Sequence, residues 1–258
     1  MLKLRVMPTM LYRDITLVKG VSFDSWRRVG SLLQQVKVYN LREVDELVVL
    51  DITATDEGRS PDFRLVDDFA DECFMPLTVG GGVRKVDDIR MLLQVGADKV
   101  AINTAAVATP NLISEGARLF GSQCIVVSID FKKRPDGRYE VYTHSGTKPT
   151  GLDPVDFAIE VEALGAGEIL LTSVDRDGTF AGYDVELTRC VVDKVNIPVI
   201  ASGGAGNYQH MVEVVKYAGA SAVAAASIFH FTEQTPAGAK EAMRQADIPV
   251  RLKTIVAP

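Results

Sequence analysis

The chain has 258 residues, 47% of them hydrophobic, which is enough for one large core, and we expect a single domain over residues 1–258. Its net charge of −6 argues against broad nucleic-acid or anionic-membrane binding, because both need clustered cations. An N-terminal signal pattern and apolar runs long enough to cross a bilayer are both missing from the sequence, which predicts a cytoplasmic protein.

Short apolar runs alternate with longer amphipathic stretches along the chain. The first begins at residue 5 and ends near Leu11 and Tyr12. Such runs, separated by helical patterns like that of residues 84–97, indicate parallel strands buried on both faces. Eight strand–helix units in about 250 residues predict a (β/α)8 barrel. The other seven runs span residues 47–52, 75–80, 99–103, 124–130, 168–174, 197–203 and 222–227.

The two halves of the chain resemble each other. The segments DELVVLDI, MPLTVGGGV and VGADKVAINTAAV are answered by GEILLTSV, IPVIASGGAG and AGASAVAAASIF, displaced by about 122 residues, so that Glu46 pairs with Glu168. This pattern indicates a duplicated half-barrel. Duplication predicts two related ligand sites that face each other across the barrel.

Each half also has a glycine cluster after a strand, at residues 79–83 and 202–206. In each half the next strand ends in small polar residues that open a helix, at 103–106 and 226–229. Glycine lets backbone N–H groups approach an anion closely, and a helix start adds partial positive charge. One such cluster alone indicates only a tight turn. Two at matched positions predict two phosphate cradles, and therefore a ligand with a phosphate at each end.

Two carboxylates follow strands, at Asp51 and Asp130. Asp130 ends a run with no other charge, where low-dielectric walls can raise its pKa, and it is the best acid/base candidate. A carboxylate at a strand end can instead organise the N–H groups of the next loop. For Asp51 both interpretations stay open.

Eight segments together resemble the cyclase subunit of imidazole glycerol phosphate synthase (HisF) along nearly the whole chain. The resemblance implies a HisH-like glutaminase docked on the N-terminal face of the barrel, and ammonia that travels through the barrel to a substrate with two phosphates. It also implies a pair of aspartates, on strands one and five, as general acid and base. The segments are DELVVLDITAT, PLTVGGGVR, GADKVAINTAAV, GSQCIVVSID, HSGTKPTG, GAGEILLTSVDRDGT, IPVIASGGAG and AASIFHF.

Most family positions carry over to this chain. Lys19 matches the lysine of the mobile substrate loop, and Asp130 matches the strand-five aspartate. One phosphate is assigned to Gly82, Asn103 and Thr104, and the other to Asp177, Gly178, Gly204, Ala226 and Ser227.

The strand-one aspartate is missing, because Leu11 stands at its position. Leucine cannot transfer a proton, and losing one of two acid/base groups is expected to lower the rate by roughly 10²–10⁴-fold. Asp14, in the following loop, is an alternative proton donor if the loop folds back. The same loop departs from the family in DSWRRVG, where Trp26 is either a packed loop residue or a substrate platform, and two adjacent arginines suggest a different acidic surface or ligand.

The other end of the barrel keeps the family pattern. Four charged residues at or near strand starts are expected to form a closed ring: Arg5, Glu46, Lys99 and Glu168. A structural salt-bridge plug is the plain interpretation, because the bottom of such barrels usually serves stability. The resemblance instead implies an ammonia gate, with Thr78 along the conduit and Asp98 on the docking surface.

Three functions follow as hypotheses. The first is a HisF-like subunit of a glutamine amidotransferase that passes ammonia onward for amidation of a surface-polysaccharide sugar, together with a separate ATP-dependent amidating enzyme. The second is a genuine cyclase of histidine biosynthesis. The third is a non-catalytic phosphate-binding scaffold. Three scattered cysteines and isolated histidines predict no metal site, and we expect no cofactor.

Overall fold

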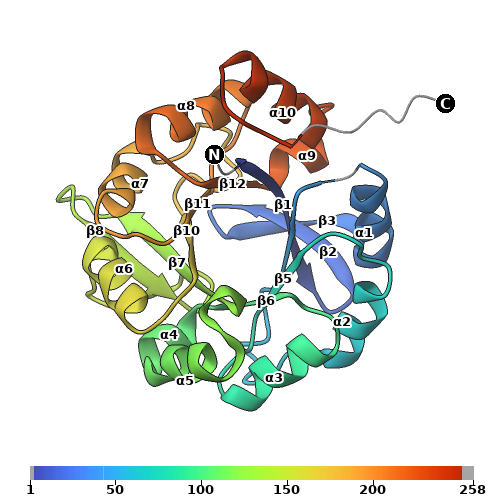
Figure 1. The fold of residues 1–258 in the computed structure, drawn as a ribbon, viewed down its shortest axis with the longest axis vertical. Coiled ribbons are helices and arrows are strands. Elements are labelled where there is room, and N and C mark those ends of the chain that lie inside the picture. The colour runs from blue at the N-terminus through green and yellow to red at the C-terminus, as the bar shows by residue number, and fades with distance from the viewer. Residues whose placement is uncertain (1–2, 43, 252–258) are drawn as a thin grey trace.

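The computed structural model describes residues 3–42 and 44–251 of the chain. Eight parallel strands form a barrel that pairing between β7 and β10 closes (Figure 1). The predicted (β/α)8 barrel is confirmed. In their order around the barrel, the strands are β10 (Glu168–Ser173), β11 (Val199–Ser202), β12 (Ala222–Ala225), β1 (Arg5–Arg13), β4 (Leu47–Asp51), β5 (Leu77–Gly80), β6 (Lys99–Ile102) and β7 (Ile125–Lys133).

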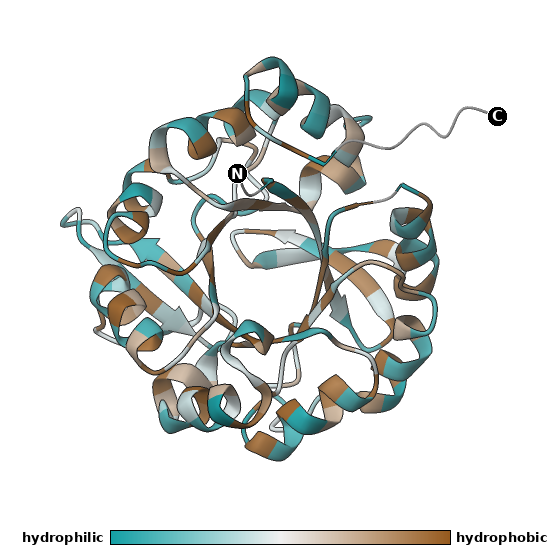
Figure 2. Cartoon of the chain, viewed as in Figure 1, coloured by the Kyte–Doolittle hydropathy of each residue, from teal (hydrophilic) through white to brown (hydrophobic). Residues whose placement is uncertain are grey.

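Helices surround the barrel, and hydrophilic residues are frequent on the surface that they present outward (Figure 2). Several begin at a side-chain cap: Asp62, Asp153, Asp184 and Asn207 each accept a backbone N–H of the first turn. No helix within residues 3–42 and 44–251 is both long and apolar enough to span a bilayer. The helices are α1 (Leu32–Leu41), α2 (Phe63–Ala70), α3 (Val86–Gln94), α4 (Thr104–Ala108), α5 (Asn111–Phe120), α6 (Pro154–Ala163), α7 (Val185–Val192), α8 (Tyr208–Ala218), α9 (Ser227–Phe231) and α10 (Pro236–Gln245), with a 3₁₀ turn at Ser122–Cys124.

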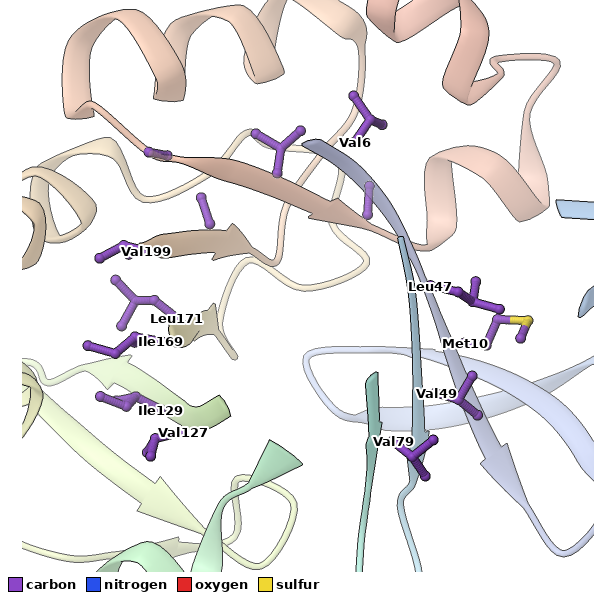
Figure 3. Close-up of a cluster of buried hydrophobic side chains, with 14 of the residues drawn as sticks. Val6, Met10, Leu47, Val49, Val79, Val127, Ile129, Ile169, Leu171 and Val199 are labelled. Atoms are coloured by element: carbon purple, nitrogen blue, oxygen red, sulfur yellow. The ribbon is translucent and has the colours of Figure 1, made fainter. Parts of the chain in front are cut away.

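The core has two parts because strand side chains alternate between the two faces of the sheet. The larger part lies between the strands and the helices, and includes Val49, Val127 and Leu171 (Figure 3). The smaller part lies inside the barrel, between its two ends. This inner layer consists of Met7, Val48, Ala101, Val126, Leu170, Ile200, Ala222 and Ala224.

Two hairpins extend from the ends of β1 and β7, where the sequence suggested only loops. The first, β2 (Thr16–Val21) and β3 (Asp24–Ser31), pairs with β1, and β3 pairs with β2 alone. The second comprises β8 (Tyr139–Thr143) and β9 (Lys148–Pro149). The turns of the first hairpin place Asp14, Ser22 and Phe23 at φ values between 50° and 60°. Non-glycine residues seldom adopt this conformation, so the sequence gives little sign of these turns.

Candidate active site

A pocket opens at the carboxyl ends of the barrel strands. Its empty space, open solvent at the mouth included, is about 980 Å³. Residues from both halves of the internal repeat line it, so the structure brings most of the predicted site together. These residues are Leu11, Lys19, Asn103, Thr104, Asp130, Asp177, Gly178, Gly204, Ala226 and Ser227.

Asp130 lies on β7 with only 7% of its surface exposed. Asn103 donates a hydrogen bond from Nδ2 to Asp130 Oδ2 at 3.0 Å, and a second to the Ser128 carbonyl at 2.9 Å. Burial raises the pKa of Asp130 to about 7, the Asn103 hydrogen bond opposes this rise, and the negative charge of Asp177 adds to it. An oriented carboxyl group with this pKa can either donate or accept a proton near neutral pH.

The raised pKa of Asp130 predicts a pH-dependent stability. The protonated carboxyl stabilises the fold fully below pH 4, and this contribution disappears as the pH rises through about 7. We expect Asp130→Asn to be more stable than the parent chain at pH 8, by up to about 4 kcal/mol, and equal to it near pH 4. Urea unfolding of both proteins at the two pH values measures the difference. Equal stability at pH 8 would contradict the prediction.

Leu11 lies across the barrel from Asp130, on β1, and its side chain forms part of the pocket wall. The suggested stand-in, Asp14, is exposed in the turn between β1 and β2 and is not among the residues that line the pocket. The hairpin carries this side chain outward instead of folding it back. Asp14 is therefore wrong as a replacement acid in this conformation.

The residues predicted to form the phosphate cradle of the second half are covered by the first hairpin. Lys19 is buried and forms an ion pair with Asp177, and the Ser22 N–H donates to the Asp177 carbonyl at 2.7 Å. Gly178 must be glycine here, since a Cβ would lie 2.4 Å from the Gly20 oxygen. The Ser227 hydroxyl is buried without a hydrogen-bond partner in the described structure. A ligand phosphate would supply that partner.

The cradle of the first half is more fully paired. The Thr104 hydroxyl donates to Asn103 Oδ1 at 3.3 Å and accepts the His144 N–H at 3.1 Å. Gly82 lies beside the pocket, where a Cβ would come within 2.8 Å of Ala54 Cβ, and its neighbour Gly81 lines the pocket instead. Of the three residues predicted for this phosphate, two therefore face the pocket directly.

Asp51 organises the loop that follows β4. Its Oδ1 accepts the N–H groups of Thr53 at 3.0 Å and Ala54 at 3.1 Å, and Arg59 forms a bidentate pair with both carboxylate oxygens. A carboxylate held by so many donors is fixed in position, so its geometry favours the loop-organising role over proton transfer.

Several polar residues of the pocket were missed in the sequence, and two of them form a row with Asp130. Thr172 on β10 and Ser202 on β11 line the pocket and continue the row that starts at Asp130, because Asp130 pairs in register with Thr172 and Thr172 with Ser202. The only sequence signal is a small hydroxyl residue at the end of an apolar run.

The four predicted charges at the other end do form a closed ring. Arg5 Nη1 lies 2.7 Å from Glu46 and 3.0 Å from Glu168, while Lys99 Nζ lies 3.0 Å from Glu46 and 3.1 Å from Glu168. Thr78 donates its hydroxyl to Glu46 Oε1 at 2.9 Å. Glu46 therefore holds three partners and is the centre of the network.

A family model described as histidine biosynthesis protein matches residues 5–235 of the chain. The match spans all eight barrel strands and both predicted phosphate cradles.

Proposed function

The chain belongs to the histidine biosynthesis protein family, and from this premise we propose that it is a HisF-like subunit of a glutamine amidotransferase. In this proposal a HisH-like glutaminase docks on the N-terminal face and releases ammonia into the barrel. The ammonia then reaches the pocket at the opposite end and serves to amidate a surface-polysaccharide sugar, with a separate ATP-dependent amidating enzyme. The observation that carries the proposal is Leu11. A leucine at the position of the strand-one aspartate leaves the chain without one of the two proton-transfer groups that the resemblance implies.

The polarity of the barrel interior supports the proposed passage of neutral ammonia. Its entrance is the charged ring, and the layer above consists of apolar side chains, among them the small Ala101, Ala222 and Ala224. Apolar walls give ammonium little stabilisation and therefore favour passage of neutral ammonia. The ring is closed in the structure, so the proposal requires that partner docking opens it.

The N-terminal face also carries exposed apolar side chains. Leu41, at the end of α1, is 78% exposed, and Phe74, between α2 and β5, is 80% exposed. Both lie where a helix end leads into a strand start, which is the face that holds the charged ring. Asp98 lies on this face before β6, and its carboxylate accepts the Leu77 N–H at 2.8 Å. Large exposed apolar side chains beside fixed charges are typical of protein interfaces.

We expect the double substitution Leu41→Ser and Phe74→Ser to weaken glutaminase association roughly tenfold or more, because such anchors dominate interface energies. The stability of the barrel should change little, since both side chains are already exposed. The measurement is the concentration of this chain that gives half-maximal stimulation of glutamine hydrolysis. Ile159→Ser, at an exposed position on α6, is the matched control. Unchanged stimulation would place the docking surface elsewhere.

The decisive experiment combines the purified chain with the HisH-like glutaminase of the same genome and measures glutamine hydrolysis. Stimulation that is lost in Lys99→Ala supports an ammonia-receiving subunit. Absence of stimulation would leave a phosphate-binding scaffold that does not receive ammonia.

A genuine cyclase of histidine biosynthesis is the second candidate, because Asp130 lies in the pocket at the position that corresponds to the strand-five aspartate. Its test is turnover of the bis-phosphorylated ribotide with ammonium salt at high pH, where no glutaminase is needed. Turnover at ordinary enzymatic rates would exclude our proposal.

A further inference from the structure

The two sides of the pocket floor differ in polarity. On one side Leu11 of β1 and Leu50 of β4 are register partners and both line the pocket. On the other side lies the row formed by Asp130, Thr172 and Ser202. β1 and β4 stand opposite β7 and β10 in the closed strand order, so the Leu11–Leu50 pair faces the Asp130 row across the barrel. The separation is partial, because Thr9 of β1 and Asp51 of β4 also line the pocket.

Trp26 adds an aromatic surface at the mouth of the pocket. It lies on β3 of the first hairpin, is half-buried and lines the pocket. Its indole packs against the backbone of Gly20, where a Cβ would come within 3.1 Å of Trp26 Cε3. β2 pairs with both β1 and β3, so the hairpin extends the sheet from the strand that carries Leu11.

This arrangement matches the chemistry of a sugar ring. A cyclic sugar has a face of C–H groups, which packs on aromatic and aliphatic side chains, and an edge of hydroxyl groups. Carboxylate and hydroxyl side chains accept and donate hydrogen bonds to such an edge. An open-chain sugar has no permanent apolar face and loses more conformational freedom on binding.

We propose that the pocket binds a phosphorylated cyclic sugar. The apolar face of the ring lies against Trp26, Leu11 and Leu50, and the hydroxyl edge lies along the Asp130 row. The phosphate lies at the cradle that contains Gly204 and the unpaired hydroxyl of Ser227. This inference rests on the phosphate-binding part of the proposed function, and it makes Leu11 a specificity-determining residue as well as the site of a lost acid.

The test compares glucose 6-phosphate with glucitol 6-phosphate by isothermal titration calorimetry on the full chain. The two ligands carry the same phosphate and differ mainly in whether the sugar is cyclic. We expect the cyclic ligand to bind at least tenfold tighter. Trp26→Ala and Leu11→Asn should each reduce this preference below threefold, while Trp26→Phe should keep it. Arg28→Ala, on the same strand but not lining the pocket, is the control for changes to the hairpin.

Equal affinity for the two ligands would overturn the inference, as would a preference that survives Trp26→Ala and Leu11→Asn. Tighter binding of uridine 5′-monophosphate than of glucose 6-phosphate would also overturn it, in favour of a planar base. Failure of all three ligands to bind would overturn it without touching the ammonia role, which glutaminase stimulation measures separately. Ser227→Ala should weaken both sugar phosphates equally, because it acts on the shared phosphate.

Discussion

Leu11→Asp is expected to close the imidazole ring of the bis-phosphorylated ribotide roughly 10²–10⁴ times faster than the parent chain, with ammonium salt at high pH. The physical reason is the restored second proton-transfer group, across the barrel from Asp130 in the same pocket. Burial already gives Asp130 a pKa of about 7, so Asp130 itself can exchange a proton near neutral pH. The measurement is the appearance of product under saturating substrate.

The matched control is Leu11→Asn. Its side chain has about the size and polarity of aspartate but cannot exchange a proton. This variant should show none of the rate gain of Leu11→Asp, because it adds no ionisable group. Asp130→Asn in the Leu11→Asp background should abolish the gain, because the two carboxyl groups act as a pair. A parental chain that already matches Leu11→Asp would show that Leu11 does not limit this chemistry.

Glu46→Ala is expected to destabilise the barrel by about 3–5 kcal/mol, the typical cost of breaking a buried ion-pair network. Glu46 is 2% exposed and accepts hydrogen bonds from Arg5, Lys99 and Thr78. Its removal leaves Glu168 to pair with both cations, and the Thr78 hydroxyl loses its partner. Urea unfolding of the parent and the variant measures the change.

A double variant distinguishes two roles of the charged ring, an ammonia gate and a structural plug. Glu46→Leu with Lys99→Met removes one anion and one cation, and it leaves Arg5 paired with Glu168 at 3.0 Å. Apolar replacement of such a pair often preserves stability. We expect this variant to stay folded but no longer to stimulate the glutaminase normally. A stable variant with normal stimulation would identify the ring as a plug.

The barrel was predictable because strand-length apolar runs recur eight times and the two halves repeat each other. Both patterns arise because strand residues are buried, and the order of apolar and polar residues can be seen directly in the sequence. The first hairpin was not predictable, because its turns place Asp14, Ser22 and Phe23 in a conformation that favours glycine. The second hairpin left a weak sign, since YEVYT has the β-branched and aromatic content of a strand.

Individual site residues were harder to judge than the fold. The ring of four charges followed from strand starts alone, because parallel strands begin at one end of a barrel. The role of Asp51 depended on Arg59, eight residues later, and on loop N–H groups whose direction the sequence does not give. Thr172 and Ser202 were overlooked because their contribution arises from register between neighbouring strands, which no local pattern specifies.

The position of Trp26 also has an optical consequence, because it is the only tryptophan among the 258 residues. Indole emission will respond to the release of the β2–β3 segment, whereas far-ultraviolet circular dichroism follows the barrel as a whole. Within the described residues β3 pairs only with β2, so this segment is expected to detach at a lower denaturant concentration than the barrel requires. Separate midpoints from the two signals would then reflect local opening, and a single two-state fit would understate how firmly the remaining strands hold together.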